Sequence, residues 1–136
     1  MKKGQLIEKT GCPEAELKPN QKMMITGLDR DLKSILQYAL DSYGCQPLFR
    51  ETACEALLNS RIEEYDYILV DHHTPGMNGL ALTRRLRERY PLAIIIGMST
   101  EDREVAFLRA GANDFLRKPF VPYRLAMMIT GADILA

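Results

Sequence analysis

The stretch YDYILVDHHTPGMNGLALTRRLRERYP, residues 65–91, determines the fold class of this 136-residue chain. Its apolar run Tyr67–Val70 has the pattern of a buried strand and ends directly on Asp71. A loop at 72–78 leads into a segment at 79–90 whose apolar residues recur at helical spacing, and a proline follows. A strand, a loop and a helix in this order form the repeating unit of parallel α/β sheets.

The same alternation extends in both directions from this stretch. The predicted strands are 23–26, a weak one at 46–50, 67–70, 93–96 and 114–117. The predicted helices are 29–43, a short one capped by Thr52, 79–90, 101–110 and 122–130. Five strands that alternate with five helices predict a doubly wound (βα)5 parallel sheet with helices on both faces.

Composition narrows the function classes. Eighteen Lys and Arg balance eighteen Asp and Glu, so the formal net charge is zero, which argues against direct nucleic-acid binding. No apolar run has the roughly 20 residues that a membrane helix needs. The three cysteines have no metal-ligand spacing and are typical of reduced thiols in a cytoplasmic protein. We expect an N-terminal extension at 1–21, poorly ordered, and one domain at 22–136.

Polar residues follow three of the predicted strands. Asp71 ends the central strand, Ser99 lies near the end of the next, and Lys118 follows the last. Because the carboxyl ends of parallel strands meet at one edge of a sheet, these side chains should converge there. A carboxylate nucleophile with a hydroxyl and an ammonium beside it suits phosphoryl transfer.

The stretch at 65–91 and the segment AGANDFLRKPF at 110–120 together resemble the receiver domain of two-component response regulators, the CheY-like fold. The resemblance covers 22–136 and implies the strand order 2-1-3-4-5. It further implies that Asp71 accepts a phosphoryl group from a histidine kinase or phosphotransfer protein and that Lys118 contacts that group. Phe115 would be the aromatic residue that reorients on activation, and Pro119 would follow a cis peptide bond.

The position of the switch hydroxyl depends on the alignment. Counting forward from Pro91 places Ser99 there, whereas counting back from Lys118 without gaps places Ile96 there. We prefer Ser99, with its side chain facing Asp71, because Ile96 fits the apolar strand. The cost is a deletion of about three residues, which would shorten the fourth helix by about one turn.

The largest departure from the family concerns the cation site. Receivers end their first strand with two adjacent acids that hold Mg²⁺, and here Gly27 and Leu28 occupy those positions. Asp71 and the backbone carbonyl of His73 would remain as ligands. Asp29 would reach the site only if the strand end bulged.

Two functions remain open at this point. The first is a phosphorylated receiver that signals to a downstream protein partner, as a phosphoacceptor domain and not as an enzyme. The alternative is a pseudo-receiver, an interaction module without Mg²⁺-dependent phosphorylation. We interpret His72 and His73 as loop histidines and the four arginines at 84, 85, 87 and 89 as a solvated helix face.

Overall fold

The computed structural model of the chain describes residues 22–27, 30–58 and 65–130, so the predicted N-terminal extension lies outside the described residues. The strands are β1 (Met23–Thr26), β2 (Leu48–Arg50), β3 (Tyr67–Asp71), β4 (Ile94–Ser99) and β5 (Asp114–Arg117). The helices are α1 (Arg30–Asp41), α2 (Ala53–Leu57), α3 (Gly79–Arg89), α4 (Glu104–Ala110) and α5 (Pro122–Thr130).

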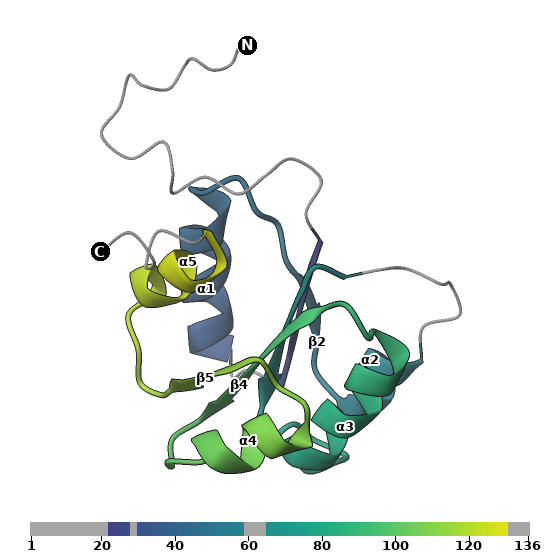
Figure 1. Cartoon of the computed structure of the whole chain (residues 1–136). Helices are drawn as coiled ribbons and strands as arrows, with labels where there is room; N and C mark the ends of the chain where they lie inside the picture. The colour runs from purple at the N-terminus through teal and green to yellow at the C-terminus, as the bar shows by residue number, and fades with distance from the viewer. Residues whose placement is uncertain (1–21, 28–29, 59–64, 131–136) are drawn as a thin grey trace.

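The strands form one parallel sheet in the order β2-β1-β3-β4-β5, which confirms the predicted fold class and strand order. Helices α1 and α5 cover one face, and α2, α3 and α4 cover the other (Figure 1). Because side chains of a strand alternate between faces, β3 contributes Leu69 to the core under α1 and α5, and Ile68 and Val70 to the opposite core. None of the described helices is long and apolar enough to cross a membrane.

The predicted ends of several elements are wrong by a few residues. β2 begins two residues later than predicted, and α3 ends one residue earlier. The apolar run 93–96 marks only the first part of β4, which runs to Ser99, as expected for its end, and stays paired with β5 to that point. The helix predicted from Glu101 begins at Glu104, since the Glu101 N–H donates to the Ser99 hydroxyl and the chain bends at residues 100 and 101. α4 therefore has seven residues.

A large side chain on α4 fits against a strand position without one. Phe107 is fully buried, and its ring occupies the place that a Cβ at Gly97 of β4 would need. This exchange of size keeps α4 close to the sheet although the helix is short. The ring of Phe107 also lies 5.6 Å from that of Phe115 on β5, which links the helix to the edge strand.

The interpretation of the four arginines of α3 as a solvated face is wrong for Arg87. Its guanidinium donates to the carbonyl oxygens of Gly111 at 2.9 Å and Ala93 at 2.7 Å, and to Asn113 Oδ1 at 2.6 Å. Further bonds reach the carbonyls of residues 90 and 91. Arg87 thus ties α3 to the start of β4 and to the connection between α4 and β5, because its planar fork presents five donors. Arg84 and Arg85 are exposed, as predicted.

We predict that Arg87→Ala lowers the free energy of unfolding by about 2–3 kcal/mol, because hydrogen bonds from a charged donor are lost and partly buried carbonyls lose their partner. Arg85→Ala, the matched exposed control, should change it by less than about 0.5 kcal/mol. Urea unfolding of both variants measures the difference. Equal losses in the two variants would contradict the assigned role of Arg87.

Candidate functional site

The carboxylate of Asp71 lies at the carboxyl edge of the sheet and is held on both oxygens. Lys118 Nζ lies 2.7 Å from Oδ2, and the backbone N–H of His73 donates to Oδ1 at 3.1 Å. The Asp71 side chain is only 4% exposed and that of Lys118 is 15% exposed. The two residues are 47 positions apart in the sequence, so their contact depends on the sheet.

Strand register explains why Lys118 reaches Asp71. Asp71 pairs with Met98 of β4, and Met98 pairs with Leu116 of β5, so these three side chains point to the same face. Lys118 comes two residues after Leu116 and therefore returns to that face. Its own N–H donates to the Ser99 carbonyl at 2.8 Å, which holds the end of β5 beside β4. The Lys118–Pro119 peptide bond is cis.

Ser99 lies at the end of β4 and is fully buried. It comes one residue after the register partner of Asp71, so its side chain points to the opposite face. Its Oγ accepts the Glu101 N–H at 3.0 Å and lies 3.5 Å from His72 Nδ1. The expected orientation toward Asp71 is therefore wrong: the hydroxyl contacts the residue that follows Asp71. Ile96 pairs with Leu69, inside the core under α1 and α5.

His72 lies in the turn that follows β3, as predicted, but its side chain is buried, which the sequence analysis did not foresee. It is 6% exposed, and its ring lies 6.1 Å from that of Phe107 in an edge-on arrangement. Burial lowers the pKa of His72 below its ordinary value of 6.5, and the nearby His73 and Arg103 lower it further. A row of contacts thus runs from Ser99 through His72 and Phe107 to Phe115, the predicted switch aromatic, which is half-buried.

Two buried threonines contact the backbone of Asp71, and the sequence analysis did not single them out. Thr26 Oγ1 lies 3.1 Å from Thr74 Oγ1, and both side chains are buried. Thr74 Oγ1 donates to the Asp71 carbonyl at 2.7 Å, and the Asp71 N–H lies 3.4 Å from Thr26 Oγ1. A threonine at the end of an otherwise apolar strand was the available signal, because a buried hydroxyl needs a partner.

Gly27, which follows β1, packs against Thr74. It has a φ of +72°, and a Cβ at this position would lie 2.5 Å from Thr74 Oγ1 and 2.9 Å from Thr74 Cα. The glycine is therefore required both by its left-handed backbone and by the close approach of Thr74. Its N–H donates to the Arg50 carbonyl, which ties the end of β1 to β2.

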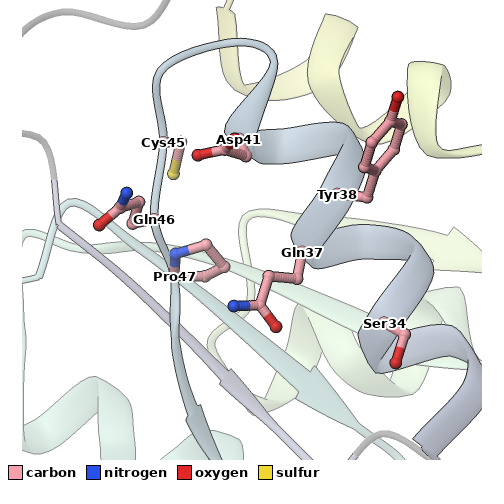
Figure 2. A pocket seen from close by; sticks show the side chains of 7 residues that line it. All are labelled: Ser34, Gln37, Tyr38, Asp41, Cys45, Gln46 and Pro47. Carbon is pink, nitrogen blue, oxygen red and sulfur yellow. The ribbon is translucent and has the colours of Figure 1, made fainter.

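Two surface hollows lie near α1. One, between α1 and the segment at 45–47, shares no residue with the cluster around Asp71 (Figure 2). The other lies between the start of α1 and the connection from β5 to α5, and its lining includes Lys118 and Thr100. The second hollow therefore lies next to the Asp71–Lys118 pair, because Lys118 forms part of its wall.

Comparison with known proteins agrees with this geometry. The profile of the response regulator receiver domain matches residues 25–130. The chain belongs to this family. It is 27% identical over 106 residues to the alkaline phosphatase synthesis transcriptional regulatory protein PhoP of Bacillus subtilis (strain 168), covering 76% of this chain and 44% of the relative. It is 32% identical over 108 residues to the C4-dicarboxylate transport transcriptional regulatory protein DctD of Rhizobium meliloti (strain 1021), covering 77% and 24%.

The fold of solved receivers is also similar. A CheY-like receiver domain protein from Methanospirillum hungatei JF-1 superimposes with a TM-score of 0.75 at 23% identity, covering 82% of this chain and 92% of that one. The present receiver spans less than half the length of the first curated relatives that it matches.

The residues of the receiver family's cation site do not fit Mg²⁺ here. Mg²⁺ takes about six oxygen ligands in near-octahedral geometry, several of them waters held by carboxylates. The only carboxylate among the described residues that form this cluster is Asp71, and Lys118 already pairs with it. No group of three or more His, Cys, Asp or Glu in the described part of the chain is arranged to hold a metal ion. Leu28 and Asp29 lie outside the described residues.

We predict that Gly27→Ala destabilises the receiver more than Gly44→Ala does. Both glycines have positive φ values, but nothing lies within 4 Å of a Cβ at Gly44, whereas Thr74 blocks one at Gly27. Each variant should lose about 1–2 kcal/mol for the backbone conformation. Gly27→Ala should lose about 1–3 kcal/mol more for overpacking. Thermal or urea unfolding measures the gap, and equal losses would refute the packing argument.

The lowered pKa of His72 predicts a dependence of stability on pH. The folded protein binds the His72 proton less tightly than the unfolded chain, so its contribution is complete above the ordinary pKa of 6.5 and is lost as the pH falls below that value. His72→Gln should flatten this part of the profile. Urea unfolding between neutral and mildly acidic pH tests it, with His73→Gln as the control. A parent-like slope in His72→Gln would contradict the assignment.

Proposed function

We propose that this receiver accepts a phosphoryl group on Asp71 from a phosphohistidine of a sensor kinase or phosphotransfer protein. The observation that carries the proposal is the Asp71–Lys118 contact of 2.7 Å at the carboxyl edge of the sheet. It places a carboxylate nucleophile next to the Lys118 ammonium, which can stabilise the negative charge of the incoming phosphoryl group. The remaining predicted residues, Ser99 and Phe115, lie on the neighbouring strands β4 and β5.

The chemistry needs one bond exchange. A carboxylate oxygen of Asp71 attacks phosphorus, an O–P bond forms, and the P–N bond to the imidazole breaks. The imidazole keeps that electron pair and leaves as a neutral ring when its other nitrogen carries a proton. Lys118 and the His73 N–H, which now contact the carboxylate, are placed to stabilise charge on the phosphoryl oxygens. The domain acts as the phosphoacceptor and turns over no separate substrate.

Receiver domains partner with histidine kinases and with downstream effectors. For this chain we propose a protein partner on the surface formed by α4, β5 and α5. Exposed apolar side chains gather there: Val105, Leu108, Val121 and Tyr123. The transcriptional regulators among its relatives are more than twice as long as the segment that matches this chain. We propose that the receiver domain itself binds protein, and neither nucleic acid nor a membrane, and that it does so in the cytoplasm.

One observation favours the alternative of a pseudo-receiver. Gly27 and Thr74 fill the place of an acidic side chain, and the Asp71 side chain is almost completely buried. Under this alternative the fold serves as a partner-binding module, and the Asp71–Lys118 pair is structural.

Intact mass after incubation with acetyl phosphate or phosphoramidate distinguishes the two functions. We expect a single phosphoryl adduct in the parent chain and in Asp102→Asn, whose exposed carboxylate is the matched control. Asp71→Asn should give none. If the parent chain gives no adduct with either donor, phosphorylation is refuted in favour of the pseudo-receiver. An adduct that persists in Asp71→Asn would refute the assignment of the acceptor.

A further inference from the structure

The charge at the site is balanced within the chain itself. Asp71 carries one negative charge and Lys118 one positive charge, and their atoms lie 2.7 Å apart. The other carboxylate oxygen accepts the His73 N–H at 3.1 Å. Each carboxylate oxygen therefore already has one partner that offsets its charge or donates a hydrogen bond to it.

Position 27, at the end of β1, has no room for a side chain. Thr74 lies where a side chain at Gly27 would be, and its hydroxyl is fixed by the Asp71 carbonyl and by Thr26. These hydroxyls are buried and hydrogen-bonded to each other, so they are not free to ligate a cation. An acidic side chain at position 27 would collide with the side chain of Thr74. Its Cβ would also lie 2.9 Å from the Cα of Thr74. A side chain at position 27 and the side chain of Thr74 therefore exclude each other.

We infer that this receiver holds Asp71 without a divalent cation, with the Lys118 ammonium as its counter-charge, and that the packing of Thr74 on Gly27 leaves no room for a cation ligand at position 27. The inference rests on the proposed function for its consequence: phosphorylation of Asp71 proceeds without Mg²⁺. Acetyl phosphate can serve as the phosphoryl donor in that step. Its P–O bond to acetate breaks as the new O–P bond to Asp71 forms, and acetate leaves with the electron pair.

Cation binding is tested directly with Mn²⁺, a paramagnetic substitute for Mg²⁺. Amide resonances of the full chain near a bound Mn²⁺ broaden, so we compare the parent with Asp71→Asn at the amides of Asp71, His73 and Lys118. We expect no broadening in the parent beyond that of the variant. Broadening at these amides that disappears in Asp71→Asn would overturn the inference, whatever the outcome of phosphorylation.

The role of the packing is tested with Gly27→Asp combined with Thr74→Gly. This pair of changes removes the Thr74 side chain, whose Oγ1 would lie 2.5 Å from a Cβ at position 27, and leaves the contact of 2.9 Å with the Cα of residue 74. It also adds a carboxylate, and aspartate tolerates the left-handed backbone better than most residues. We expect the double variant to gain broadening at the same three amides, and Thr74→Gly alone to gain none. A folded double variant that gains none would refute the assigned role of Thr74 and Gly27.

The phosphorylation arm separates this inference from the proposed function. Intact mass is followed with acetyl phosphate in excess EDTA and in excess Mg²⁺. An equal rate of adduct formation in both supports the inference. An adduct that forms only with Mg²⁺ overturns the inference and keeps the proposed function. No adduct in either condition overturns the proposed function and the phosphorylation consequence, whereas the Mn²⁺ result still decides whether the site holds a cation.

Discussion

The ion pair between Asp71 and Lys118 is the interaction on which the site depends. It joins β3 to the end of β5 across β4, and it forms only if all three strands keep their register. A pair this buried adds little net stability, because removing both charges from water costs about as much as their attraction returns. Losing one partner is different, since the other charge is then left buried at a cost of about 3–5 kcal/mol. The pair therefore fixes the geometry of the sheet edge more than the stability of the domain.

The fold was predictable because it depends on the order of strands and helices, which an error of a few residues at the end of an element does not change. Buried strands of a parallel sheet are continuous apolar runs, and those at 23–26 and 67–70 appear where predicted. Asp71 and Lys118 were predictable for the same reason, since each directly follows a strand. The orientation of Ser99 was not, because it depends on the register of β4 against β3, and a shift of one residue reverses the face. Composition and spacing carry no information on register.

The missed residues share a physical cause. Arg87, His72 and Thr74 are polar side chains whose roles are set by partners far along the chain or across the sheet. Arg87 is one of four arginines in six positions, and the α3 sequence does not show which of them meets the carbonyls around α4. The short α4 was anticipated from the deletion, but its means of support was not. Phe107 fills the space above Gly97, and this size exchange becomes visible only when helix and strand are placed together.

The charge balance at Asp71 has a consequence for the phosphorylated state. In the resting site one carboxylate faces one ammonium, so the net charge is near zero. An acyl phosphate replaces the carboxylate charge with about two negative charges, and Lys118 offsets only one of them. The His73 N–H contributes a hydrogen bond but no charge. A bound Mg²⁺ would neutralise the excess, whereas a site without a cation, as inferred above, must share it with water. The hollow lined by Lys118 and Thr100 opens to solvent beside the Lys118 side chain. Without a cation, the phosphorylated form should therefore be more open to solvent, and more readily hydrolysed, than the buried resting carboxylate suggests.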